Sequence, residues 1–95
     1  GAYGVNEASR IYFGKYINEL TLSEVALIAS LAPAPSIYSP FKNFDLAIKK
    51  RNEVLKLIYE EKYISTNEFQ NALNEPLILS FRNILVLSIL LSLIL

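Results

Sequence analysis

The sequence predicts an all-α protein, a small bundle of about four short helices followed by an apolar C-terminal helix. Between residues 44 and 61, apolar side chains recur at helical spacing and form one stripe of about 100°. Two capping boxes, in which residues three apart bond each other's free amides, mark helix starts at Thr21 to Glu24 and at Ser65 to Glu68. Glycine and proline stand where these helices should end.

Composition limits the classes of function that the chain can carry. Its 95 residues allow one small domain, and nine Lys and Arg balance nine Asp and Glu, so a nucleic-acid partner is disfavoured. The chain has no Cys and no His, which excludes thiol nucleophiles, Ser–His pairs and imidazole metal ligands. It has neither methionine nor a signal-peptide pattern at its start, which is typical of an internal or truncated piece.

The first segment is predicted to form a helix of about two turns. Asn6 is expected to cap its start, and Gly14 to end it in the left-handed conformation that glycine adopts readily. Lys15 follows directly, where a cation meets the negative end of the helix. A capping charge is therefore one interpretation of Lys15.

The central helix is expected over residues 22–31, after the first capping box. Because so few of its side chains are polar, it should be buried nearly all round. Its length of about 15 Å is half the thickness of a bilayer core, so we expect a globular core helix. Pro33 and Pro35 should end it and stiffen the loop that runs to Pro40.

Two side chains of that loop, Ser36 and Tyr38, are candidates for ligand contact, because rigid scaffolds tend to carry function on loops. Tyr38 fits a buried position in the core equally well, with its hydroxyl at the edge. Arg51 is the anomaly of the following helix, because it lies in the middle of the apolar stripe. It must snorkel, pair with protein groups or hold a ligand anion, and structural pairing is the favoured interpretation.

The second capping box begins a last short helix, which Pro76 closes. Residues 77–95 are almost entirely apolar, apart from serines and the pair Arg82 and Asn83. The uninterrupted run from residue 84 would span about 18 Å as a helix, too short for a bilayer core of about 30 Å. We therefore expect two parts, a domain at residues 1–76 and an apolar tail at 77–95 that associates with membranes or aggregates.

Three segments, taken together and in order, resemble the peptidoglycan glycosyltransferases, the transglycosylase module of bifunctional penicillin-binding proteins. They read G-A-Y-G-V-N-E-A-S-R-I-Y-F-G-K, L-T-L-S-E-V-A-L-I-A-S-L-A-P-A-P-S-I-Y-S-P and A-I-K-K-R-N-E-V-L. The resemblance covers Gly1 to Leu77 and implies the C-terminal part of a lysozyme-like glycosyltransferase domain. The leucine-rich end departs from the family, and we expect a truncated or altered product.

The resemblance implies a reaction that joins lipid-linked disaccharide-peptide units into glycan strands, with a glutamate as general base. In the family, basic residues and a divalent metal offset the charge of the leaving pyrophosphate. The family's glutamate-bearing segments are not in this sequence, so we assign no catalytic residue, no metal ligand and no cofactor to it. By resemblance, the element Y-F-G-K that ends at Lys15 borders the substrate cleft. Lys15, Ser36, Tyr38 and Arg51 are the expected substrate-binding residues.

The predicted function is therefore part of a peptidoglycan glycosyltransferase, catalytically incomplete alone. The complete domain would bind the lipid-linked precursor at the outer face of the bacterial cell membrane. An alternative from another class is a small helical, membrane-associated interaction protein that keeps the fold without the chemistry.

Overall fold

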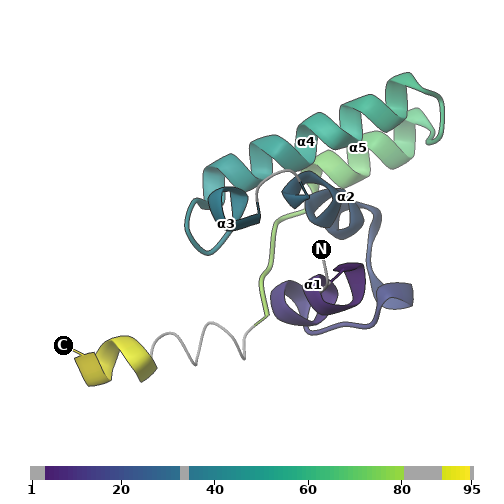
Figure 1. Ribbon diagram of the computed structural model, residues 1–95. Helices are drawn as coiled ribbons and strands as arrows, with labels where there is room; N and C mark the ends of the chain where they lie inside the picture. The colour runs from purple at the N-terminus through teal and green to yellow at the C-terminus, as the bar shows by residue number, and fades with distance from the viewer. Residues whose placement is uncertain (1–3, 33–34, 81–88, 95) are drawn as a thin grey trace. The chain divides into compact units, whose positions relative to one another are not determined.

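The computed structural model describes residues 4–32, 35–80 and 89–94 and is helical throughout its regular elements, with no strand in these ranges. Residues 89–94 are also helical. The labelled helices follow one another along the chain as α1 (Gly4–Phe13), the 3-10 helix η1 (Ile17–Glu19), α2 (Leu22–Leu31), α3 (Pro35–Tyr38), α4 (Phe44–Glu60) and α5 (Thr66–Asn74) (Figure 1). The predicted all-α class is confirmed.

Two predicted details of the helices are wrong. The segment expected to be a stiff loop contains α3, which starts at Pro35. Proline fits this position because the first residue of a helix needs no amide hydrogen and the ring already fixes a helical φ. Asn6 is not a cap, since α1 begins two residues earlier, at Gly4. The bounds of α2, Leu22–Leu31, are as expected, and Pro33, which was expected to end this helix, lies outside the described residues.

The chain divides into two compact units, one made of residues 1–20 and 78–95 and the other of Thr21–Leu77. The predicted division into a domain at residues 1–76 and an apolar tail at 77–95 stays a prediction. We describe each unit by itself.

The second unit is a packed helical core in which α2 and α5 lie against α4 (Figure 1). One small or medium apolar side chain from each helix is buried at its centre: Ala26, Leu55 and Ala72. Partly buried apolar side chains surround these, namely Leu22, Val54, Ile58, Phe69 and Leu73. In α2 only Val25 and Ala29 are exposed, so the predicted burial of this helix is confirmed.

Reciprocal capping fixes where α2 and α5 begin. The Thr21 amide donates to Glu24 Oε1 at 2.8 Å, and the Glu24 amide donates back to Thr21 Oγ1 at 3.2 Å. The Ser65 amide donates to Glu68 Oε1 at 2.9 Å, and the Glu68 amide donates to Ser65 Oγ at 3.1 Å. These bonds from Ser65 favour the charged carboxylate and lower the pKa of Glu68 below its ordinary value. Both predicted helix starts are confirmed.

The first unit is built around the C-terminal end of α1. The Gly14 amide donates to the Arg10 carbonyl at 3.0 Å, and Gly14 has a φ of +62°, as expected for a left-handed helix stop. The Ser80 amide donates to the Tyr12 carbonyl at 2.7 Å, which satisfies one of the carbonyls that a helix end leaves free. A residue far along the chain thus helps to close α1.

Gly14→Ala should destabilise this helix end by about 1–2 kcal/mol, the cost of a left-handed conformation for a residue with a Cβ. The added Cβ would also stand 3.2 Å from Ser80 Oγ, so that hydroxyl would have to shift. Hydrogen exchange of the α1 amides and thermal unfolding measure the effect. Lys62→Gly is the opposite control. Lys62 has a φ of 66°, which glycine adopts without the cost that a Cβ adds, so this variant of the chain should be more stable by about 0–1 kcal/mol. Equal melting temperatures for Gly14→Ala and the unchanged chain would contradict the role of Gly14 as a left-handed helix stop.

Candidate functional site

Arg51 is held inside the second unit by the end of a neighbouring helix. Its guanidinium donates from Nη1 to the Glu75 carbonyl at 2.8 Å and from Nη2 to the Leu73 carbonyl at 3.2 Å. Its Nε donates to Asn52 Oδ1 at 3.1 Å, and the residue is only 3% exposed. The guanidinium therefore caps the C-terminal end of α5 from α4. The favoured interpretation of Arg51, pairing with protein groups, is confirmed, whereas substrate contact by Arg51 stays a prediction.

Glu75 joins this contact to the start of α2. Its Oε2 accepts a hydrogen bond of 2.6 Å from Thr21 Oγ1, the same hydroxyl that accepts from the Glu24 amide. Burial lowers the pKa of the Arg51 guanidinium, and the negative charge of Glu75 opposes that shift. We call Arg51, Glu75 and Thr21 the Arg51 network. It connects the N-terminal end of α2, the middle of α4 and the C-terminal end of α5.

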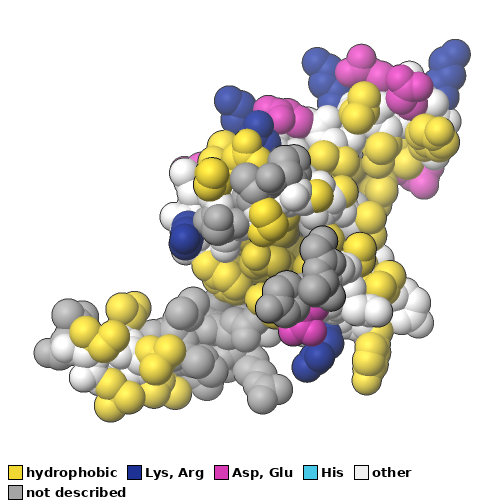
Figure 2. All heavy atoms as spheres, in the orientation of Figure 1, with side chains coloured by type: hydrophobic (Ala, Val, Ile, Leu, Met, Phe, Trp, Pro, Cys, Tyr) yellow, Lys and Arg dark blue, Asp and Glu magenta, His cyan; other side chains and the backbone are white. Residues whose placement is uncertain are grey.

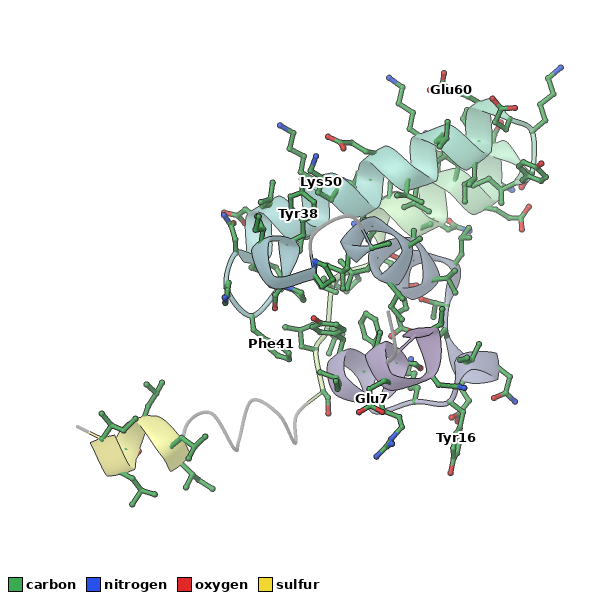
Figure 3. All side chains as sticks on the ribbon, viewed as in Figure 1. Glu7, Tyr16, Tyr38, Phe41, Lys50 and Glu60 are labelled. Atoms are coloured by element: carbon green, nitrogen blue, oxygen red, sulfur yellow. The ribbon has the colours of Figure 1, made fainter. Side chains whose placement is uncertain are left out.

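The α3 candidates stand elsewhere in the second unit. Tyr38, at the end of α3, is half-buried, and Lys50 Nζ lies 5.1 Å from the centre of its ring, in cation–π range (Figure 3). Ser36 belongs to the same helix, but its side chain lies outside the part that the structure describes. Tyr38 and Arg51 contact different partners, so the described contacts do not bring them into one site.

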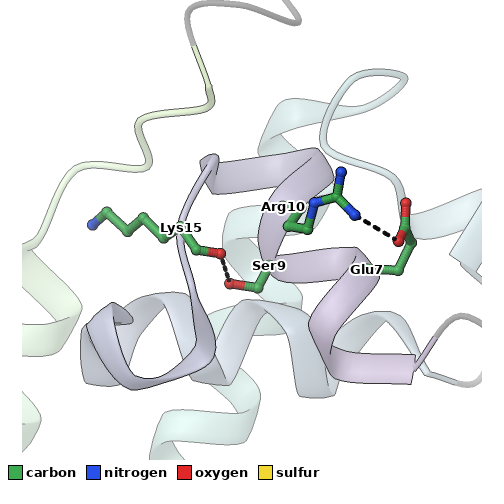
Figure 4. Close-up of polar contacts among 4 residues, drawn as sticks. All are labelled: Glu7, Ser9, Arg10 and Lys15. Atoms are coloured by element: carbon green, nitrogen blue, oxygen red, sulfur yellow. Dashed lines mark hydrogen bonds and ion pairs between the residues drawn. The ribbon is translucent and has the colours of Figure 1, made fainter.

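Lys15 lies in the first unit, next to α1. Its backbone carbonyl accepts a 2.6 Å hydrogen bond from the hydroxyl of Ser9, which is fully buried (Figure 4). The Lys15 amide also donates to the Ser9 carbonyl, at 3.4 Å. These contacts fix the backbone of Lys15 rather than its ammonium group. Its position beyond the helix end is as predicted.

A pocket of about 580 Å³ opens at Lys15. Its lining comes from the last turns of α1, the following turn and one distant residue: Glu7, Arg10, Ile11, Gly14, Lys15, Tyr16 and Ser80. Arg10 Nη1 lies 3.5 Å from Glu7 Oε2, while the side chain of Lys15 points away from that pair (Figure 4). The lining thus contains two cations and one carboxylate, which favours an anionic or partly anionic ligand.

Sequence reasoning missed most of this lining. Arg10 and Glu7 carry a weak signal, because oppositely charged residues three apart on a helix can pair. The sequence carries no signal for Ser80, because its position in the lining depends on a contact between distant parts of the chain. Among the described residues there is no group of three acidic, histidine or cysteine side chains that could hold a metal ion.

Comparison with known proteins gives the same family as the three sequence segments. Penicillin-binding protein 1A of Aquifex aeolicus is 46% identical over 83 residues, covering 87% of this chain and 11% of that protein. Penicillin-binding protein 1A of Haemophilus influenzae is 48% identical over 80 residues, covering 84% of this chain and 9% of that protein. The chain therefore spans about a tenth of the length of these relatives.

The fold agrees with the sequence likeness. The crystal structure of penicillin-binding protein 1A from H. influenzae matches 82% of this chain and 12% of its own, with a TM-score of 0.80 and 49% identity. The family model described as Transglycosylase matches residues 1–59, more than half of the sequence. The predicted resemblance is confirmed: the chain belongs to the transglycosylase family.

Proposed function

We propose that this chain forms the C-terminal part of a peptidoglycan glycosyltransferase domain, which polymerises glycan strands from a lipid-linked disaccharide-peptide. The observation that carries the proposal is the joint likeness in sequence and fold to penicillin-binding protein 1A, at 49% identity and a TM-score of 0.80. The alternative, a helical interaction protein without catalysis, gains no support from these comparisons.

The contribution of this chain is binding and orientation of the precursor. A lipid-linked precursor carries a pyrophosphate, and Lys15 lines a pocket whose charged side chains, Lys15, Arg10 and Glu7, sum to one positive charge. A fixed cation next to a leaving phosphate stabilises the charge that develops there. The Ser9 hydroxyl donates to the Lys15 carbonyl and the Lys15 amide donates to the Ser9 carbonyl, so the Lys15 side chain starts from a defined backbone position. We place Lys15 beside the pyrophosphate and leave Tyr38 and Ser36 as further candidates for precursor contact.

Proton transfer belongs to residues outside this sequence. The carboxylates of Glu19, Glu24 and Glu68 accept backbone hydrogen bonds of 2.8, 2.8 and 2.9 Å at helix starts. These carboxylates are therefore already engaged in capping, and the hydrogen bonds from Ser65 lower the pKa of Glu68, whereas a general base that works near neutral pH needs a raised pKa. We also assign no residue of this chain to the divalent metal that the family resemblance implies.

The proposed location is the outer face of the bacterial cell membrane, where a lipid-linked precursor can reach the domain. In the residues that the structure describes, no helix combines the length and the apolar character needed to cross a bilayer.

A chimera tests the proposed function. Residues 4–80 replace the matching segment of H. influenzae penicillin-binding protein 1A, and glycan formation from the lipid-linked precursor is measured. We expect polymerisation in the chimera and a rate about 10²-fold lower in its Lys15→Ala variant, because one cation beside the leaving pyrophosphate is lost. Lys49→Ala, on the exposed face of α4, is the matched control and should keep the rate. A folded chimera without activity would overturn the proposed function, and an unchanged rate for Lys15→Ala would overturn the role of Lys15.

A further inference from the structure

We infer that Arg10 is a specificity-determining residue, which binds a carboxylate in the peptide part of the lipid-linked precursor. Arg10 and Lys15 line the same pocket, yet the side chain of Lys15 points away from Arg10 and Glu7 (Figure 4). Two cations that point apart are poorly placed to bind one small anion together. The pocket therefore fits a ligand with anionic groups at two separate points. The inference rests on the proposed function, which supplies the precursor as that ligand.

The guanidinium of Arg10 is accessible to such a ligand. Its side chain is 70% exposed, and Figure 2 shows acidic and basic side chains next to each other at the surface near α1. Arg10 Nη1 lies 3.5 Å from Glu7 Oε2, whereas charge-assisted hydrogen bonds of this type are about 2.7–2.9 Å long. An exposed and loose ion pair contributes little to stability. A ligand carboxylate can therefore replace Glu7 as the partner of Arg10 at small cost.

The chemistry of the two cations suits the two anionic groups of the precursor. Arginine presents parallel N–H donors in one plane, and these match the two oxygens of a carboxylate. The ammonium group of Lys15 is a compact charge that suits a phosphate. The terminal carboxyl group of a peptide has an ordinary pKa of about 3.3–3.7, so it is charged at neutral pH. One precursor molecule can thus pair its pyrophosphate with Lys15 and a peptide carboxylate with Arg10.

A second contact to the pyrophosphate is the weaker role for Arg10. The Glu7 carboxylate repels any anion that approaches Arg10, and this repulsion is about twice as strong for a doubly charged group as for a singly charged one at the same distance. A carboxylate is therefore the better fit beside Glu7. The pocket volume of about 580 Å³ lies within the range of about 300–1,000 Å³ that is usual for ligand sites, so the pocket can hold part of the precursor between the two cations.

Two forms of the precursor test this inference in the chimera that carries residues 4–80. In one form the peptide carboxylates are free, and in the other they are converted to amides, which removes their charge and keeps their size. The KM and kcat values of both forms are measured for the unsubstituted chimera and for Arg10→Ala, Arg10→Lys and Lys49→Ala. Lys49→Ala is the matched control, because it removes an exposed cation that does not line the pocket.

We expect the KM of the amide form to be about 10-fold higher than that of the acid form in the unsubstituted chimera, since a hydrogen bond between charged groups is lost. Arg10→Ala should raise the KM of the acid form by the same factor and leave that of the amide form unchanged, because both changes remove one interaction. Arg10→Lys should keep part of the preference, since it keeps the charge without the planar fork. The kcat values should stay within about twofold, because the carboxylate is bound equally in the ground state and the transition state. Lys49→Ala should keep the preference in full.

Three results would overturn the inference. Equal KM values for the two forms in the unsubstituted chimera would show that the peptide carboxylates are not recognised, and this comparison needs no variant to fold. A KM that rises equally for both forms in Arg10→Ala would show that Arg10 contacts another group, such as the pyrophosphate. A kcat that falls in Arg10→Ala as far as in Lys15→Ala would place Arg10 at the reacting bond. Equilibrium binding of the labelled precursors gives the same comparison without turnover, so an inactive chimera would overturn the proposed function while binding still decides the role of Arg10.

Discussion

Arg51→Met should lower the free energy of unfolding by about 3–5 kcal/mol, the cost of removing one partner from a buried charged network. Methionine keeps most of the volume but leaves the carbonyls of Leu73 and Glu75 without their donors. It also removes the positive charge that faces the Glu75 carboxylate. Because small domains are stable by only about 5–15 kcal/mol, this loss should be visible as a large drop in the melting temperature.

Arg51→Lys separates charge from geometry. An ammonium group keeps the charge but lacks the planar fork that reaches two carbonyls at once, so we expect partial destabilisation. Lys49→Met is the matched control, since Lys49 is exposed on the same helix, and it should melt like the unchanged chain. Thermal and urea unfolding followed by far-UV circular dichroism measure all three variants. Suppose that both Arg51 variants have an unchanged melting temperature, and that the chimera carrying either substitution no longer binds the precursor. Arg51 would then be a ligand residue, and its structural role would be wrong.

Local signals explain what could be predicted from the sequence. The capping boxes at Thr21 and Ser65 join residues three apart, so they depend on no distant contact, and both helix starts were predicted correctly. The anomalous place of Arg51 on an apolar stripe was equally local, because the helical period alone fixes it. That position predicted that the guanidinium would need partners, and the structure supplies them.

Partners that lie far along the chain could not be predicted in the same way. Nothing near Arg51 identifies Glu75 as the residue that joins it to Thr21, because that link depends on how α2, α4 and α5 pack. The contact between Ser80 and the end of α1 has the same origin. At α3 the fault was local instead: proline was taken as a helix breaker, although it is well suited to the first position of a helix.

The 95-residue chain alone should form no detectable glycan from the lipid-linked precursor. Loss of a single general base typically costs about 10²–10⁴-fold, and here the other positioning residues of the family's glutamate segments are missing as well. Three of the chain's carboxylates already have other contacts: Glu24 and Glu68 accept hydrogen bonds from backbone amides at helix starts, and Glu7 pairs with Arg10.

Glycan formation by the chain alone is measured by gel analysis of labelled product. The active chimera is the positive control for the precursor and the reaction conditions. Glu24→Gln in the chimera should keep most of the polymerisation rate, because a glutamine oxygen can still accept the hydrogen bond from the Thr21 amide. Glycan formed by the unaided chain would show that one of its own carboxylates acts as the base. Loss of that product in Glu7→Gln, but not in Glu24→Gln, would then place the base in the pocket beside Lys15, since Glu7 lines it.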